Sequence, residues 1–254
     1  MAIQCFAPTV GEVAYLVAYP TTGLVNARSA QTLSVWFNVA SWPTVTWSMF
    51  GFYNGTANLS TAPTTAVQIG TRNGTVMDVW TWGGGVMISS TGFTLPTNTW
   101  FHVAYTCNTF GTNQTHQLYI NGVLNNTTTN TIQINGVLTQ IYINGYPEGS
   151  RTAETGAWLM DDARCFDRQL TADEIRTIAS VRGSSDGICS GSVCRYDFSE
   201  GYLGTSVGGG VNGAVGAVDL SSQLNNLTLV RTTASPAPIY VADYSDRYER
   251  PTHS

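Results

Sequence analysis

The sequence predicts an all-β fold in which antiparallel strands pack as two facing sheets, with one short helix. Short runs of aromatic and β-branched residues recur along the chain, and their side chains alternate as in half-buried strands. Asn-Gly pairs, a strong hairpin signal, follow several of these runs. Hydrophobic residues make up 43% of the 254 residues, so the chain can bury a sizeable core.

The first part of the chain predicts closely spaced strands. Val13–Tyr19 is an apolar run that ends in a turn. Gln31–Val39 is the clearest early strand, because its apolar residues at alternate positions share one face. Glycine-containing turns separate the strands that we expect next, which are Trp47–Tyr53, Ala66–Thr71, Thr75–Trp82 and Val86–Ser89.

The stretch from Trp100 to Gly122 predicts the centre of the fold. Two strands face each other across a polar loop, Asn108–Thr115. Asn121 and Gly122 then supply the two positive-φ residues of a type I′ turn. We expect three consecutive hairpins over Trp100–Ile143, with a polar tip at Asn125–Thr131 and short strands at Ile132–Val137 and Gln140–Ile143.

A further strand and a helix are predicted after these hairpins. The strand is Ala157–Phe166. Thr171 and Glu174 form a capping box, which marks the start of a helix. We expect the helix to end at Gly183.

Three pieces of the sequence resemble one known family. Trp100–Thr106 followed by Leu118–Gly122 resembles the central signature of laminin-G-like domains, which belong to the concanavalin A-like lectin/glucanase superfamily. Leu33–Phe37 resembles the family's early strand, and Trp158–Ile175 resembles its closing strand and short helix. The pieces keep the family's order over residues 30–182. The resemblance implies a concanavalin A-like jelly-roll sandwich of two antiparallel sheets.

A fourth piece carries the family's opening motif but lies after the predicted helix. Arg195–Gly201 and Val218–Leu229 resemble a segment that precedes the early strand in the family, and residues 1–30 carry no such motif. We therefore expect this piece to complete the same sandwich, because a missing strand would leave an unpaired sheet edge. The expected division is a jelly roll at 1–182, a Gly/Ser linker at 183–193, a completing segment at 194–242 and a tail at 243–254.

The charge and hydropathy of the chain argue against two kinds of partner. A net charge of −5 and a pI near 5.0 do not fit nucleic-acid binding, which needs a basic surface. No apolar run approaches the roughly 20 residues of a membrane span. Residues 1–5 lack the basic region of a signal peptide. We expect no nucleic-acid or membrane partner, and synthesis in a cytoplasm without ordinary export.

The five cysteines leave the disulfide state open. Cys5, Cys107 and Cys165 lie in apolar strand runs, as small buried residues do. Cys189 and Cys194 could close a small disulfide loop. The alternative is two free thiols, which a reducing cytoplasm favours.

The acidic residues do not predict catalysis. A glucanase of this superfamily would need two carboxylates converging on one substrate, and the sequence lacks such a pair. Asp161 and Asp162 are adjacent, so a regular strand would place them on opposite faces. They are the candidate ligands for calcium, the one cofactor that the resemblance suggests. The alternative is that one of them pairs with Arg164 or Arg168 and the other caps a loop.

Aromatic side chains predict a candidate carbohydrate site. Tryptophan rings can form a platform for sugars, although most tryptophans in a β-sandwich belong to the core. Gly83–Gly85 would permit a ligand to approach closely. The candidate platform residues are Trp42, Trp47, Trp80 and Trp82.

Two function classes remain. The first is a non-enzymatic structural protein of a virus particle, such as a capsid decoration or cement protein, a fibre or a tail component. Laminin-G-like jelly rolls occur in bacteriophage structural proteins, and the resemblance therefore favours this class, with adhesion to cell-surface glycans as an added role. The second class is a free carbohydrate-binding lectin, because a fold alone does not fix a function.

The C-terminal tail predicts contacts between proteins. Tyrosine and arginine, which are enriched in interfaces, recur in it. We expect a homo-oligomer that contacts other virion proteins, and the alternative is a tail that folds back on its own domain. The expected contact residues are Tyr240, Tyr244, Arg247, Tyr248 and Arg250.

Overall fold

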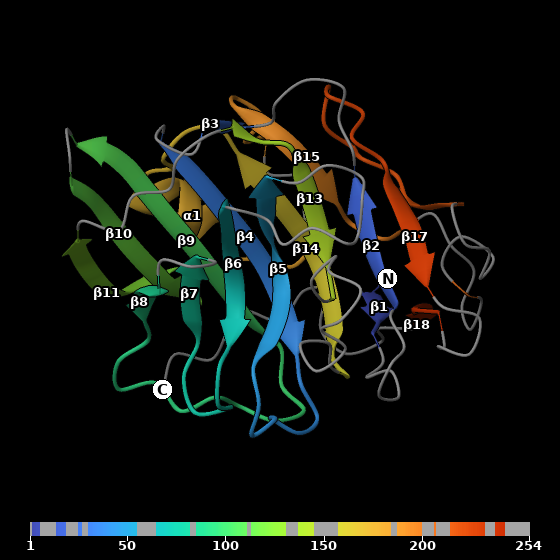
Figure 1. Cartoon of the computed structure of the whole chain (residues 1–254), viewed down its shortest axis with the longest axis horizontal. Helices are drawn as coiled ribbons and strands as arrows, with labels where there is room; N and C mark the ends of the chain where they lie inside the picture. Colours follow the sequence, from blue (N-terminus) through green and yellow to red (C-terminus); the bar gives the residue numbers. More distant parts are fainter. Residues whose placement is uncertain are drawn as a thin grey trace.

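The fold consists of two antiparallel sheets that pack face to face (Figure 1). The computed structural model confirms the predicted all-β sandwich with one short helix. It describes residues 2–5, 14–18, 25–26, 30–54, 65–81, 85–110, 113–130, 137–144, 157–183, 187–199, 206, 214–231 and 237–241.

The first sheet is built around the predicted central strands. Its path runs through β11 (Val123–Asn130), β10 (Asn113–Ile120), β9 (Phe101–Phe110), β4 (Gln31–Asn38), β14 (Leu159–Phe166), β1 (Ala2–Gln4) and β18 (Ile239–Val241). Off this path, β15 (Ser192–Tyr196) pairs with the second half of β14.

The second sheet contains strands from the N-terminal, middle and C-terminal parts of the chain. Its order is β16 (Val215–Ala217), β17 (Leu227–Arg231), β2 (Ala14–Ala18), β13 (Gln140–Ile143), β5 (Trp47–Asn54), β6 (Thr65–Thr71), β7 (Asp78–Thr81) and β8 (Gly85–Ser89). A separate two-stranded ladder pairs β12 (Val137–Leu138) with β3 (Val25–Asn26).

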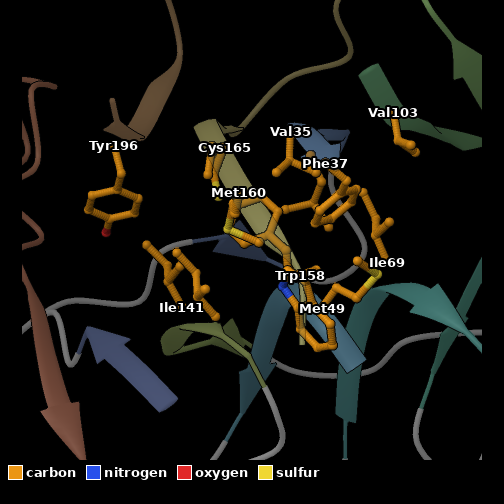
Figure 2. Packing of buried hydrophobic residues seen from close by; sticks show 14 of the residues in the cluster. Val35, Phe37, Met49, Ile69, Val103, Ile141, Trp158, Met160, Cys165 and Tyr196 are labelled. Atoms are coloured by element: carbon orange, nitrogen blue, oxygen red, sulfur yellow. The ribbon is translucent and has the colours of Figure 1, made fainter. Parts of the chain in front are cut away.

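The core lies between the sheets and follows the strand alternation (Figure 2). On β9, Phe101, Val103 and Tyr105 point into it, whereas His102 and Ala104 lie on the other face. Met49 and Ile69 face them from the second sheet. The period-two pattern in the sequence therefore assigns the buried face of this strand correctly.

The helix α1 (Ala172–Ile178) covers the outer face of the first sheet. Ile175 and Ile178 pack with Ala104 and Tyr119, which point away from the main core. The predicted capping box is present: the Thr171 hydroxyl accepts from the Glu174 N–H, and Glu174 Oε2 accepts from the Thr171 N–H. The helix is shorter than predicted, with its C-cap at Ala179 instead of Gly183. Nothing helical in the described ranges has the length and apolarity needed to cross a membrane.

The polar character of residues 108–131 misled the strand assignment. Residues 125–130, expected to be a tip, belong to β11, and the expected loop at 108–115 is mostly strand. β11 forms one end of the first sheet, where side chains can remain in water, so asparagine and threonine are tolerated. The third expected hairpin is also wrong, because β13 lies in the second sheet between β2 and β5.

The segment after the helix supplies strands to both sheets. β15 pairs with β14, β17 pairs with β2, and β18 pairs with β1 (Figure 1). Tyr196, Phe198 and Leu229 from this segment are buried in the common core. β15 begins at Ser192, inside the range expected to be a linker.

Candidate functional site

Two of the predicted platform tryptophans are buried. Trp47 is 9% exposed and its ring lies 5.0 Å from that of Trp158 between the sheets. Trp80 is 7% exposed and covers Gly70, where a Cβ would lie 2.8 Å from the indole. Neither ring offers a face to a sugar, so the prediction is wrong for both. The two rings are buried by the packing of the sandwich, as most tryptophans in such a fold are. Trp82 lies outside the described residues.

Trp42 is placed differently, in the loop between β4 and β5. Its side chain is half-buried and packs against Phe101, with the ring centroids 6.0 Å apart. Its indole N–H donates a hydrogen bond of 2.8 Å to the carbonyl of Pro96. The ring is therefore held in one orientation while part of its surface stays in water.

Three loops meet around Trp42 and form what we call the loop rim, residues 39–46, 72–77 and 90–100. The loops lie together at the lower edge of the sandwich in Figure 1. The Asn98 N–H donates to the carbonyl of Val39 at 2.9 Å, which ties the third loop to the first. Gly74 sits so close to the carbonyl of Pro43 that a Cβ would lie 1.9 Å from its oxygen. The loop rim is thus a packed surface built from three loops.

The second loop of the loop rim carries exposed polar side chains. The Arg72 side chain is 49% exposed, and its Nε is 3.1 Å from the buried Asp78 carboxylate, which positions the guanidinium. Asn73 Oδ1 accepts hydrogen bonds from the N–H and the hydroxyl of Thr75, both exposed residues. An aromatic face beside oriented donors and acceptors is the kind of surface that recognises a small polar ligand.

The contact between Gly74 and Pro43 yields a prediction for the loop rim. Gly74 and Gly92 both have positive φ, 72° and 60°, but only Gly74 has a neighbour within reach of a Cβ. We expect Gly92→Ala to lower the free energy of unfolding by about 1 kcal/mol, from backbone strain alone. Gly74→Ala should lower it by about 2–4 kcal/mol, because the loops must also separate. Urea unfolding of both variants measures the difference, and equal losses would contradict the packing described here.

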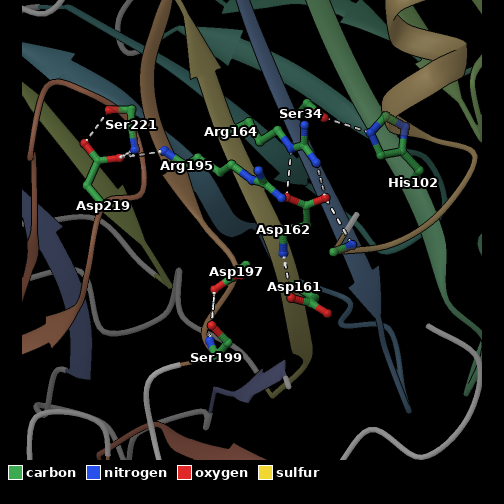
Figure 3. A network of polar contacts seen from close by, with 11 residues as sticks. Ser34, His102, Asp161, Asp162, Arg164, Arg195, Asp197, Ser199, Asp219 and Ser221 are labelled. Carbon is green, nitrogen blue, oxygen red and sulfur yellow. Dashed lines mark hydrogen bonds and ion pairs between the residues drawn. The ribbon is translucent and has the colours of Figure 1, made fainter. Parts of the chain in front are cut away.

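Asp161 and Asp162 lie at a bulge in β14 and are both buried (Figure 3). Between Asp161 and Arg164 the pairing with β4 shifts by one residue, and Asp162 takes a φ of 46°. Arg164 grips Asp162 with two bonds, Nε to Oδ1 at 2.8 Å and Nη2 to Oδ2 at 2.6 Å. Arg182 lies 3.6 Å from Asp161, and Arg195 lies 3.6 Å from Asp162.

These arginines overturn the calcium prediction for the two aspartates. A guanidinium already neutralises Asp162, and a cation placed there would face several positive charges. Burial, followed by the neighbouring Asp162 carboxylate, raises the pKa of Asp161 well above its usual range. No group of three or more His, Cys, Asp or Glu side chains suited to a metal ion occurs in the described part of the chain. Adjacent side chains are buried all along this central part of β14, so Asp161 and Asp162 each meet arginines of the same chain instead of solvent.

The ion network extends from β14 into the C-terminal segment. The Arg195 N–H donates to Asp219 Oδ1 at 2.9 Å, while its guanidinium faces Asp162 (Figure 3). Asp219 also accepts from the N–H of Ser221 and from the N–H of Asn225. Buried charge therefore links the segment after the helix to the strands before it.

His102 on β9 is buried beside this network. Its Nε2 is 2.8 Å from the Ser34 hydroxyl, and its ring packs against Trp36 with centroids 5.4 Å apart. Burial, followed by the charge of Arg164, lowers the pKa of His102 from 6.5 to about 3. Because the Ser34–His102 pair is shielded from solvent, it cannot meet a substrate and is structural.

The lowered pKa of His102 gives a prediction with a definite sign. As the pH falls below 6.5, His102 becomes protonated in the unfolded chain, whereas in the folded chain it stays neutral until the pH approaches 3. The stability from this group is therefore full above pH 6.5 and declines toward pH 3. Between pH 7 and pH 5 the free energy of unfolding should fall by about 2 kcal/mol more in the wild type than in His102→Gln, because glutamine cannot titrate. Urea unfolding at both pH values measures this, and identical losses in the two proteins would refute it.

Tyr240 is not a contact residue between proteins. It is 5% exposed, and its hydroxyl donates to the carbonyl of Gly216 at 2.8 Å. The prediction that Tyr240 contacts another protein is wrong, because β18 pairs with β1 and the Tyr240 side chain points into the core of its own chain. The other four predicted contact residues, Tyr244, Arg247, Tyr248 and Arg250, lie outside the described residues.

The sequence reasoning missed most of the loop rim. Asn73 and Gly74 were interpreted only as a turn, and Phe93 and Pro96 lie in a stretch that matches no strand pattern. A signal was present, since a loop with tryptophan or phenylalanine among threonines and asparagines is unusual for a simple connection. What the sequence could not supply was the meeting of loops far apart in the chain.

Comparisons with known proteins agree with this architecture. Residues 11–176 match the family model described as the Concanavalin A-like lectin/glucanases superfamily. No curated protein matches the sequence. A Bacteroides ovatus ATCC 8483 protein whose name suggests carbohydrate binding has a similar structure, with a TM-score of 0.58 and 19% identity over 95% of this chain. This chain spans only 62% of that one.

A second solved structure shares the sandwich. It is the heptameric SAP-like pentraxin from Limulus polyphemus, with a TM-score of 0.52 and 15% identity. The match covers 70% of this chain and 81% of the pentraxin. At such identities the likeness concerns the fold alone, and it says nothing about which residues of this chain bind a ligand.

Proposed function

Because this chain belongs to the concanavalin A-like lectin/glucanases superfamily, we propose that it is a non-enzymatic, lectin-like binding module that uses its loop rim to bind glycans. We further propose that it serves as a structural protein of a virus particle, where it contributes surface contacts and adhesion to cell-surface glycans. The observation that carries the first proposal is the half-buried, oriented ring of Trp42 on a loop rim whose second loop carries exposed polar side chains.

The chemistry of the loop rim suits a sugar. A pyranose presents an apolar C–H face and a rim of hydroxyl groups, so it fits an aromatic face beside hydrogen-bonding groups. Trp42 supplies the face, and Arg72, Asn73 and Thr75 supply donors and acceptors. The Asp78 contact engages the Nε of Arg72, and the guanidinium carries two further NH2 groups that can donate hydrogen bonds.

Three buried acids among the described residues are engaged in structural contacts, which supports the proposed role without catalysis. Hydrolysis of a glycosidic bond needs two carboxylates that reach one substrate. Asp78 is held by Arg72 and Ser89, Asp162 by Arg164, and Asp219 by backbone N–H groups and Ser221. Each of these carboxylates is engaged in structure and buried from solvent.

The glycan proposal is tested by screening the purified chain on an array of cell-surface glycans. We expect retention of at least one glycan class together with no release of reducing sugar from the bound glycan. Release of reducing sugar would overturn the non-enzymatic part of the proposal. Failure to bind any glycan would overturn the binding part.

The virion proposal rests on the laminin-G resemblance and on the tail at 243–254, which combines tyrosine with arginine. Homo-oligomers and other virion proteins are the proposed partners, and the virion is the proposed location. Mass spectrometry of purified virus particles tests this directly. The chain should be recovered in stoichiometric amount with the particles, and its absence from washed particles would refute the assignment.

A further inference from the structure

Two of the five cysteines face each other across neighbouring strands. Cys165 on β14 and Cys194 on β15 are direct partners in the antiparallel register. Both are buried in the main core, which Figure 2 shows around Cys165, and both are free thiols.

The alternative pair suggested by the sequence has a different geometry. Cys189 is exposed, whereas Cys194 is buried, and both are free. The side chain of Cys194 thus points into the core toward Cys165 and not toward the surface loop. If Cys194 forms a disulfide without rearrangement of its strand, the structure leaves Cys165 as its partner.

The register satisfies the spacing that a disulfide requires. Directly opposed residues of an antiparallel pair have Cα atoms about 4.5–5.5 Å apart, and a disulfide accepts about 4.4–6.8 Å. Their Cβ atoms lie on the same face of the sheet, as the burial of both side chains in one core shows. Closure needs only a rotation of the two side chains.

We propose that Cys165 and Cys194 form an intramolecular disulfide when the protein meets a low-molecular-weight disulfide such as oxidised glutathione. In this exchange, the thiolate of one cysteine attacks glutathione disulfide and releases a first glutathione thiol. The second cysteine then attacks the mixed disulfide and releases a second glutathione thiol. The protein loses two protons and two electrons, and one glutathione disulfide becomes two glutathione molecules.

The fold controls when this reaction occurs. Burial raises the pKa of Cys165 well above its usual value, so the thiol in the closed sheet is a poor nucleophile. β15 pairs with β14, and its backbone is also bonded to Asp219, Leu220 and Asn225, so both sets of contacts must open before the thiols are exposed. Oxidation therefore follows the local opening of β15, and the product fastens the C-terminal segment to β14.

The test exposes full-length protein to oxidised glutathione in urea below the unfolding midpoint, followed by removal of urea. Non-reducing peptide mapping should find the Cys165–Cys194 link, with a mass lower by about 2 Da. The melting temperature should rise by roughly 5–15 °C, because the crosslink constrains the unfolded chain. Dithiothreitol should reverse both changes.

Two variants serve as matched controls. Cys189→Ser should oxidise like the wild type, since the exposed cysteine takes no part. Cys194→Ala should show neither the mass change nor the thermal shift. A link that involves Cys189, stable mixed disulfides with glutathione as the only product, or no mass change at all would each overturn the proposal.

Discussion

Replacement of Arg164 by methionine is expected to lower the free energy of unfolding by about 3–5 kcal/mol. The side chain is 2% exposed, and its two bonds to Asp162 satisfy most of the carboxylate. Methionine has a similar volume but no charge, so Asp162 would remain buried with the more distant Arg195 and the Gly183 N–H as partners. Urea unfolding at pH 7 measures the loss.

Two comparisons isolate the cause of this loss. Arg176→Met removes an exposed ion pair with Asp173 on α1 and should change stability by less than about 0.5 kcal/mol. The double variant Asp162→Asn, Arg164→Met removes both buried charges, and asparagine tolerates the positive φ at this position. It should be more stable than Arg164→Met alone. A double variant that is less stable than either single variant would show that charge burial is not the cause.

A chain that ends at residue 193 is expected to lose its cooperative fold. The truncation removes most of β15 and all of β16, β17 and β18, and with them Tyr196, Phe198 and Leu229 from the common core. Each buried side chain of this kind contributes about 1.5–3 kcal/mol. For these three side chains the total is about 4.5–9 kcal/mol, which is comparable with the lower half of the roughly 5–15 kcal/mol of net stability that a folded domain has.

The matched control ends at residue 242. It keeps every described strand, so it should unfold cooperatively with nearly the wild-type midpoint. Circular dichroism and urea unfolding of both truncations measure the contrast. Cooperative unfolding of the shorter chain would mean that residues 194–242 are not needed for the sandwich.

The strands of the fold were predictable where large apolar side chains recur at every second position. On β4 and β9 the alternation of residue types reports the two environments, and the structure bears it out. On β11 both faces can reach water, so the pattern carried no strand signal. The laminin-G resemblance is confirmed by the family match, whereas the early end of the helix was not visible in the sequence.

The candidate site was less predictable than the fold. Residue type alone suggested four tryptophans, but tertiary packing decides which ring faces water, and Trp47 and Trp80 fill the sandwich. The adjacent aspartates were predicted as possible calcium ligands, and the sequence did not reveal the bulge at Asp162 or the arginines that pair with both side chains. Contacts between distant loops, such as Trp42 with Pro96, depend on the folded topology, which local sequence patterns do not encode.

The binding role of the loop rim is tested most directly by titrating a glycan retained on the array against the wild type and Trp42→Leu. Loss of the aromatic face should weaken binding roughly tenfold to a hundredfold. Trp80→Phe, a change at a buried ring, should leave the affinity of the folded protein unchanged. The account predicts this split between the two variants. Equal affinity of folded Trp42→Leu and wild type would contradict it and place any glycan site elsewhere on the sandwich.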